Sequence, residues 1–267
     1  MYKNHKIVVV TPSGRKKYQE ILFHYLTKQL DIIDEYRIWV NTHCKFNRDW
    51  FRSLAIENSW VTLDIRQKAG GNHNINQFFN KCIDENTIYI RLDDDIVYLD
   101  PDFIKNIVDF RIENPEYFLI LGNIINNSIC TFLHREKNII DVNFDMNFYA
   151  MNQLWHNPDY ARTIHEIFIN DLKNHDTNKY KTINNHVMKF YKRFSINAIC
   201  WFGHKFKTFN GIVHGDEEQY LTEIYTKKTK TPNIICSNAL CSHLSFRPQR
   251  SFVANSSILA DYRSLLR

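Results

Sequence analysis

The hydrophobic pattern in the first half of the chain alternates between two periods. Short runs of β-branched and aliphatic residues predict buried strands at residues 7–10, 36–40, 60–65, 87–92 and 118–125. Apolar residues at three- and four-residue spacing predict helices at residues 15–30, 47–57, 75–82 and 101–112. Repeated strand-then-helix order is typical of parallel strands joined by right-handed crossovers. The sequence therefore predicts an α/β fold, with a mostly parallel central sheet and helices on both faces.

The second half begins with a looser, polar and aromatic stretch. We interpret residues 127–194 as a helical insertion, with helices expected at 158–172 and 186–194. The segments expected after it are a strand at 195–202, a turn at 211–215, a helix at 216–225, a strand near 233–236 and a final helix at 256–266. No internal repeat or low-complexity linker divides the chain, so we expect one compact domain over residues 1–267.

Composition supports a folded protein and excludes several classes. The chain has 44% hydrophobic residues, only 7 Gly and 6 Pro, and a net charge of +5, which rules out collagen-like and mainly disordered chains. The mild basic excess contains no run of five Lys or Arg, so it favours phosphate-bearing ligands and no nucleic-acid partner. The six cysteines form no C-x-x-C pair, and we expect buried thiols in a reducing compartment.

Membrane and targeting signals are not expected. No window approaches the roughly 18 uncharged apolar residues of a membrane span. The first residues, which include Lys3 and Lys6, lead directly into a predicted strand and lack a signal-peptide pattern. We therefore expect no membrane span and a cytoplasmic location.

Three adjacent carboxylates, Asp93-Asp94-Asp95, directly follow the predicted strand at 87–92. At the end of a buried strand such charges repel one another and are poorly hydrated, so they need a cation or several hydrogen-bond donors. Mn²⁺ or Mg²⁺ suits carboxylate oxygens and keeps positions for water and substrate phosphate. The alternative is a solvated turn that caps the helix beginning at Pro101. Placement at the tip of a strand in an α/β domain favours the metal site.

The segment Tyr89-Ile90-Arg91-Leu92-Asp93-Asp94-Asp95-Ile96 resembles the D-x-D region of nucleotide-sugar-dependent glycosyltransferases with the A-type (GT-A) fold. The order of further motifs extends the resemblance: Thr11-Pro12-Ser13-Gly14, Gly70-Gly71-Asn72, Asp216-Glu217-Glu218 and His243. The likeness covers about residues 5–126 and 195–250. It implies a nucleotide-sugar-binding half at about 1–126 and an acceptor and catalytic half at about 195–267.

By this resemblance, Asp95 ligates the metal directly, Asp93 or Asp94 holds the ribose or a metal-bound water, and His243 is a further ligand. We place the metal ligands at Asp95, Asp93 and His243. The metal would neutralise the diphosphate of the leaving nucleotide. A lone histidine after a strand is also compatible with a core or surface role. Arg91 is expected to pair with a carboxylate of the triplet.

Two loops supply candidate contacts to the nucleotide. In the first, Thr11, Ser13 and Gly14 are placed to hydrogen-bond the base or ribose, with Arg15 near the phosphates; a simple turn explains the same residues. In the loop at 66–72, Arg66 and the backbone N–H of Gly71 are candidates, although two glycines fall short of a phosphate-loop motif. Because carboxyl ends of parallel strands meet at one edge, the loops after residues 10, 40, 65 and 92 should line one cleft.

Asp216 and Gln219 have the spacing of a capping box, which gives this segment a structural interpretation. If Asp216 caps a helix, Glu217 can project into the cleft and take the proton of an acceptor hydroxyl, as an inverting transfer requires. We favour Glu217 as this base, then Asp216; a retaining reaction needs no such base. Trp201 and Phe202 are candidates for an apolar wall against an acceptor sugar, with core packing as the alternative.

The sequence thus predicts a glycosyltransferase that moves a sugar from a nucleoside diphosphate donor to a hydroxyl of a glycan or glycoconjugate, with Mn²⁺ or Mg²⁺. The alternatives are a sugar-phosphate nucleotidyltransferase, which releases pyrophosphate, and a glycan-binding module without turnover. Serine-hydrolase, P-loop and dinucleotide-binding motifs do not occur in the sequence.

Overall fold

The computed structural model describes residues 1–65, 75–144, 147–189 and 191–266. The strands are β1 (Lys6–Ser13), β2 (Glu35–Val40), β3 (Val61–Ile65), β4 (Thr87–Leu92), β5 (Ile96–Leu99), β6 (Ile120–Ile125), β7 (His186–Val187), β8 (Ala198–Phe202) and β9 (Ile234–His243). The longer helices are α1 (Lys16–Thr27), α2 (Lys45–Glu57), α4 (Phe103–Glu113), α5 (Ser128–Glu136), α7 (Pro158–Lys173) and α12 (Ile258–Ser264). The short helical elements are η1 (Asn76–Lys81), α6 (Gln153–His156), η2 (Thr177–Thr182), α8 (Gly203–Lys207), α9 (Glu217–Gln219), η3 (Tyr220–Ile224), α10 (Tyr225–Thr229), η4 (Arg247–Gln249) and α11 (Arg250–Ala254).

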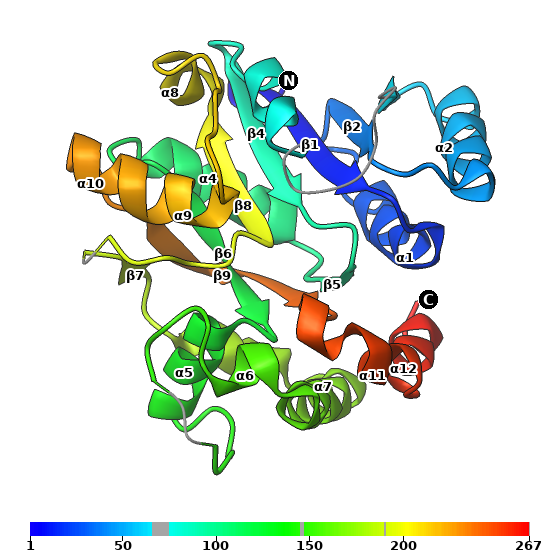
Figure 1. The fold of residues 1–267 in the computed structure, drawn as a ribbon, viewed down its shortest axis with the longest axis vertical. Helices are drawn as coiled ribbons and strands as arrows, with labels where there is room; N and C mark the ends of the chain where they lie inside the picture. The colour runs from blue at the N-terminus through cyan, green and yellow to red at the C-terminus, as the bar shows by residue number, and fades with distance from the viewer. Residues whose placement is uncertain (66–74, 145–146, 190, 267) are drawn as a thin grey trace.

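One mixed sheet organises the molecule (Figure 1), in the order β3-β2-β1-β4-β8-β6-β9-β5, with β7 beside β9. The strands β3, β2, β1 and β4 pair in parallel, and β9 pairs in parallel with β6. The strands β8, β5 and β7 pair antiparallel with their neighbours. The predicted α/β fold with a mostly parallel sheet flanked by helices is therefore confirmed.

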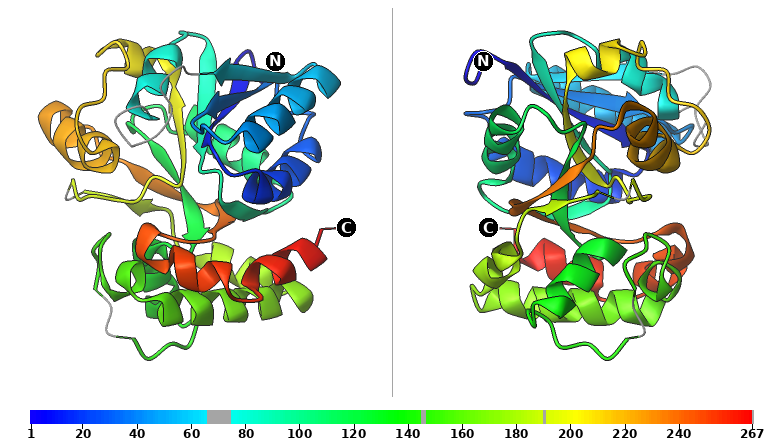
Figure 2. Two further views of the ribbon diagram at one scale, coloured as in Figure 1. Left: turned by 45° about the vertical axis from the view of Figure 1, so that its right-hand side comes forward. Right: turned by 90° about the vertical axis from the view of Figure 1, so that its left-hand side faces the viewer.

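The core follows the apolar runs of the sequence. Ile7 to Val10 in β1 are fully buried, as their continuous β-branched run predicts. A second apolar cluster includes Phe168 of α7, Leu244 after β9 and Tyr262 of α12. The views in Figure 2 show α5, α6, α7, α11 and α12 together as a helical layer beside the sheet. This layer contains most of residues 127–194; that these residues are an insertion remains a prediction.

The prediction of a helix at residues 186–194 is wrong. His186 and Val187 instead form β7, which pairs antiparallel with Ile234 and Ile235 of β9. The N–H of Met188 donates to the carbonyl of Asn233 at 2.8 Å, so backbone pairing with β9 replaces the helical hydrogen bonds. Long-range pairing outweighs a weak local pattern in this segment.

Other differences concern length and short elements. The strand expected near 233–236 continues to His243, and several elements were not predicted, among them the strand β5 and the helix α5. The start of α5 has a sequence signal, because the side chain of Asn127 accepts hydrogen bonds from the N–H groups of Ile129 and Cys130. The six cysteines are free and all except Cys44 are buried, as expected. Among the described helices, none combines the length and apolar character needed to cross a membrane.

Candidate active site

A cleft of about 800 Å³ lies at the carboxyl ends of β1, β2 and β4. The order in which successive strands are added reverses at β1, since β2 and β3 lie on one side of β1 and β4 lies on the other. Ligands of open α/β sheets bind at such switch points. The lining residues include Gly14, Arg15, Asn41, Thr42, Asp93, Asp94, Asp95, Glu217, His243, Arg247 and Arg250. Arg66 and Gly71, predicted to contact a nucleotide, lie outside the described residues.

The carboxylate of Asp94 is held by the loop after β1. Its Oδ2 accepts hydrogen bonds from the N–H groups of Gly14 at 3.0 Å and Arg15 at 3.1 Å. The guanidinium of Arg15 also contacts Asp94, with Nε 3.1 Å from Oδ1. Burial raises the pKa of Asp94, although the charge of Arg15 opposes this. Asp94 thus joins the first loop to the acidic triplet.

Asp93 is oriented by two side chains from β4 and the segment before β8. Its Oδ1 lies 2.8 Å from Nη2 of Arg91, and its Oδ2 accepts a hydrogen bond from Nδ2 of Asn197 at 2.9 Å. The expected pairing of Arg91 with a carboxylate is therefore confirmed. Asn197 was not identified from the sequence, because a single Asn before a strand carries no recognisable motif.

The strand β9 brings His243 beside Asp95. The backbone N–H of Leu244 donates to the carbonyl of Asp95 at 2.9 Å, and His243 Nε2 lies 3.4 Å from Asp95 Oδ1. One ligand atom from each of Asp93, Asp95 and His243 lies within 4.8 Å of the other two. Two residues separated by one position in the sequence and one far along the chain are thus brought together.

Positively charged groups beside this cluster keep Asp95 ionised. Burial raises the pKa of Asp95, but Arg15 and His243 outweigh it and hold that pKa well below its usual range. Asp95 Oδ2 lies 3.0 Å from Arg15 Nη2. Within the described part of the chain, His243 Nδ1 is buried and makes no hydrogen bond. Two carboxylates and an imidazole with this unsatisfied nitrogen form a donor set that fits Mn²⁺ or Mg²⁺.

Glu217 is the first residue of α9 and contacts Arg91, which also contacts Asp93. Its Oε1 accepts a hydrogen bond from Arg91 Nη2 at 2.9 Å, and its side chain is 13% exposed. Among the described residues its Oε2 is buried without a hydrogen bond. Burial raises the pKa of Glu217 to about 7. The charge of Arg91 lowers this pKa, but neighbouring carboxylates, including Asp93, raise it further. A carboxyl group near neutrality is suited to proton transfer at physiological pH.

Asp216 has the capping role that its sequence position predicts. Its Oδ1 accepts a hydrogen bond from the N–H of Gln219 at 2.8 Å. The Gln219 side chain instead contacts Glu223 at 3.4 Å. Arg193 Nη2 lies 2.9 Å from both Asp216 Oδ2 and Glu218 Oε2. Arg193 was missed because the sequence placed it in a helix that does not form.

Two predicted nucleotide contacts do not reach the cleft with their side chains. Thr11 and Ser13 are fully buried, and Ser13 Oγ donates to Gln19 Oε1 at 2.9 Å. Gly14 and Arg15 of the same loop do line the cleft. Thr11 and Ser13 lie within β1, whose sheet is covered on both faces, whereas Gly14 and Arg15 follow the end of the strand.

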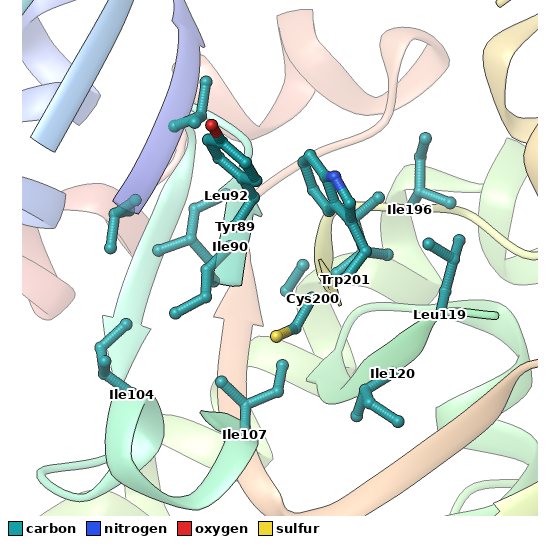
Figure 3. Close-up of a cluster of buried hydrophobic side chains, with 14 of the residues drawn as sticks. Tyr89, Ile90, Leu92, Ile104, Ile107, Leu119, Ile120, Ile196, Cys200 and Trp201 are labelled. Carbon is teal, nitrogen blue, oxygen red and sulfur yellow. The ribbon is translucent and has the colours of Figure 1, made fainter. Parts of the chain in front are cut away.

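Trp201 and Phe202 do not form an apolar wall of the cleft; both are buried, as the alternative of core packing expects. Trp201 is completely buried, donates from Nε1 to the carbonyl of Cys82 at 3.2 Å, and stacks on Tyr89 with ring centroids 5.6 Å apart. Figure 3 shows Trp201 among the apolar side chains of the core. The strand β8 lies in the middle of the sheet, so both of its faces are covered. Among the described residues, Trp155 and Phe246 line the cleft instead.

No protein-family model and no curated protein matches the sequence. Solved structures match the fold. Residues 1–349 of TarS from S. aureus match with a TM-score of 0.52 and 13% identity, over 97% of this chain and 71% of that one. Mannosyltransferase PcManGT from Pyrobaculum calidifontis, in complex with GDP-Man and Mn²⁺, has a TM-score of 0.55 and 12% identity, over 94% and 60%. GalNAc-T7 with UDP, GalNAc and Mn²⁺ has a TM-score of 0.57 and 7% identity, over 100% and 48%.

These structures are larger than the present chain, which spans less than two thirds of PcManGT and of GalNAc-T7. At such low identities the likeness concerns the arrangement of the backbone. It agrees with the resemblance carried by the Asp93-Asp94-Asp95 segment at the tip of β4. The chain therefore has the A-type glycosyltransferase fold.

Proposed function

We propose that this protein is a metal-dependent glycosyltransferase that transfers a sugar from a nucleoside diphosphate donor to a hydroxyl group of a glycan or glycoconjugate, with inversion at the anomeric carbon. The observation that carries the proposal is the convergence of Asp93, Asp95 and His243 in one cleft with the buried carboxyl group of Glu217. The Mn²⁺ found with PcManGT and with GalNAc-T7 supports the metal dependence.

Asp93, Asp95 and His243 would hold the metal ion, as the resemblance implies. When bound there, the ion would neutralise the negative charge that develops on the leaving diphosphate. Because the donor set contains an imidazole, it favours Mn²⁺ over the harder Mg²⁺.

We assign residues at the ends of β1 and β2 to the nucleotide. Gly14 and Arg15 line the cleft after β1, and Asn41 and Thr42 line it after β2. Arg247 and Arg250 are exposed on the segment that follows His243, and they line the same cleft. We assign these two arginines to the phosphates, because a planar guanidinium matches phosphate oxygens.

Glu217 is the proposed general base. Its Oε1 is held by Arg91, which leaves Oε2 free to accept the proton of the acceptor hydroxyl. The acceptor oxygen forms a bond to the anomeric carbon as the bond between that carbon and the diphosphate breaks. The electron pair of the broken bond leaves with the diphosphate, and attack from the opposite face inverts the configuration. Asp216 is the second candidate for the general base, because its carboxylate is engaged by Gln219 and Arg193.

The test is a product assay. Nucleoside diphosphate sugars are incubated with the protein, Mn²⁺ and a panel of glycans, and the released nucleotide and the anomeric configuration of the product are determined by mass spectrometry and NMR. Release of a nucleoside diphosphate together with an inverted glycoside is the expected result. Pyrophosphate formed from a nucleoside triphosphate and a sugar phosphate would instead show nucleotidyl transfer. Glycan binding indifferent to metal and to Asp95→Asn, without turnover, would show a binding module.

A further inference from the structure

The cleft has an aromatic wall that neither the metal site nor the base explains. Met151, Trp155 and Phe246 line it, and Trp155 is half-buried in the short helix α6. The ring centroids of Trp155 and Phe246 are 5.9 Å apart with planes inclined by 35°. Phe246 in turn lies 4.7 Å from the ring of His243. The wall therefore continues from the proposed metal ligand toward the helical layer.

The aromatic wall is fixed by buried polar contacts. Gln249 is completely buried, and its Oε1 accepts hydrogen bonds from the N–H of Phe246 at 3.0 Å and Nδ2 of Asn126 at 3.1 Å. Its Nε2 donates to the carbonyl of Leu154, the residue before Trp155. Asn152 caps α6 by accepting a hydrogen bond from the N–H of Leu154 at 3.0 Å. Gln249 thus sets the position of Trp155 relative to His243, and a platform held in this way is prearranged for a ligand.

Polar groups adjoin the wall on the side of the base. Arg193 Nη1 lies 3.2 Å from Met151 Sδ, and Nη2 of the same guanidinium pairs with Asp216 and Glu218 on either side of Glu217. Arg193 therefore links the aromatic wall to the segment that carries Glu217. A ligand there has an apolar surface on one side and hydrogen-bonding carboxylates on the other.

The following inference rests on the proposed function, whose acceptor would be the occupant of this wall. We propose that Trp155 is the platform on which the ring of an acceptor sugar stacks, so that the acceptor is a glycoside. A pyranose has an apolar C–H face and a rim of hydroxyls, which matches one aromatic platform flanked by carboxylates. Most residues that line the cleft are charged or polar, which does not suit an acyl chain. A peptide acceptor would need backbone partners along an extended groove, and the lining residues do not come from an exposed strand edge.

The test compares the wild-type protein with Trp155→Ala, Trp155→Phe and a control, Trp50→Ala, on α2. Saturation-transfer NMR is recorded with methyl glycosides of glucose, galactose, mannose and N-acetylglucosamine in the presence of UDP or GDP and Mg²⁺. We expect at least one glycoside to receive saturation at the protons of one ring face. The signal should be lost in Trp155→Ala, retained in part in Trp155→Phe and unchanged in Trp50→Ala.

Transfer assays with the same variants provide the second measurement. The KM for the glycoside should rise at least tenfold in Trp155→Ala, whereas the KM for the donor stays within twofold. No glycoside signal with the wild type, or equal signals in wild type and Trp155→Ala, would overturn the inference. Exclusive transfer to a Ser- or Thr-containing peptide would overturn it as well.

The two proposals fail in different ways. Thermal stabilisation by a nucleoside diphosphate with Mn²⁺, and release of nucleoside diphosphate from the donor, report on the proposed function alone. If both are present and glycoside binding ignores Trp155, only the platform is wrong. If both are absent, the proposed function is wrong, and the NMR comparison still decides whether Trp155 holds a sugar.

Discussion

Nη2 of Arg91 lies 2.9 Å from Oε1 of Glu217 and 2.8 Å from Oδ1 of Asp93. A single buried guanidinium therefore joins the acidic triplet at the end of β4 to the first turn of α9. The Nη1 atom donates to the carbonyl of Ile196 at 3.2 Å, which ties the segment before β8 to the same group. Arg91 is 5% exposed on its side chain, so these charges interact with little solvent screening.

Arg91→Met should impair both stability and transfer. Removal of one partner from a buried ion pair typically costs about 3–5 kcal/mol, because the other charges remain buried. Arg91 also lowers the pKa of Glu217 against burial, so its loss should raise that pKa and move the rising limb of the pH–rate profile to higher pH. Denaturant unfolding and a pH profile of the transfer rate measure these effects.

Arg91→Lys separates charge from geometry. It keeps a positive charge but loses the planar group whose Nη2 contacts both carboxylates while Nη1 donates to the carbonyl of Ile196, so we expect an intermediate loss of rate and a smaller shift of the pH profile. Arg52→Met, which removes one half of an exposed ion pair with Asp49, is the matched control and should change neither quantity. A pH profile of Arg91→Met that coincides with the wild type would contradict the coupling to Glu217.

The activity should increase with pH through about 7. Burial raises the pKa of Glu217 to about 7, and only the deprotonated carboxylate accepts a proton. Glu217→Gln should reduce the transfer rate by about 10²–10⁴-fold at pH 8 and leave nucleotide binding unchanged. The measurements are the steady-state rate from pH 5.5 to 9 and a thermal shift with nucleoside diphosphate and Mn²⁺.

Two further variants locate the base. Asp216→Asn should retain the cap of α9 and most of the rate, because Asn is an equally good N-cap residue. Glu223→Gln changes another carboxylate in the same helical segment and serves as the control. If Glu217→Gln keeps the wild-type rate while Asp216→Asn loses it, the base is Asp216.

Metal binding should stabilise the folded protein. Mn²⁺ with a nucleoside diphosphate, at 100 times its dissociation constant, should add about 2.7 kcal/mol and raise Tm, and a chelator should reverse the change. Asp95→Asn should abolish this shift, whereas Asp49→Asn, an exposed carboxylate on α2, should not.

The preference of the protein for Mn²⁺ over Mg²⁺ should show whether His243 is a metal ligand. We expect Mn²⁺ to stabilise the wild type more than Mg²⁺ does, because the cluster includes an imidazole. His243→Ala should reduce the stabilisation by Mn²⁺ more than that by Mg²⁺. Equal losses for the two ions would indicate that His243 does not bind the metal.

Glu35 provides a pH-dependent contribution to stability far from the cleft. Burial raises its pKa, but hydrogen bonds from Arg37, Lys6 and Thr62 outweigh it and lower the pKa to about 2. The folded state thus favours the ionised form, so this stabilisation is complete above the ordinary pKa of 4.5 and disappears as pH falls toward 2. Because the side chain is partly exposed, we expect Glu35→Gln to cost about 1–2 kcal/mol at pH 7.

The measurement is urea unfolding of Glu35→Gln and wild type at pH 7 and near pH 2.5. The difference in the free energy of unfolding should shrink at the lower pH. Glu57→Gln, an exposed carboxylate at the end of α2, should match the wild type at both values. A difference that persists unchanged at pH 2.5 would show that Glu35 stabilises the fold through packing.

Local pattern in the sequence was sufficient for much of the sheet. The run Ile7 to Val10, the strand that ends at Leu92 and the carboxylates that follow it were all predictable, because burial of a parallel strand requires continuous apolar residues. The cap at Asp216 was predictable for a similar reason, since it depends on residues within one helical turn.

Contacts between distant segments came only from the tertiary structure. Arg91 and Glu217 are 126 positions apart, and no local period relates them. The register of β5 with β9 decides that His243 lies beside Asp95, and the enclosure of β8 on both faces decides that Trp201 is in the core while Trp155 lines the cleft. Periodicity records which side of a segment is buried; which segments meet depends on strand order and register, and these are fixed only when the whole sheet assembles.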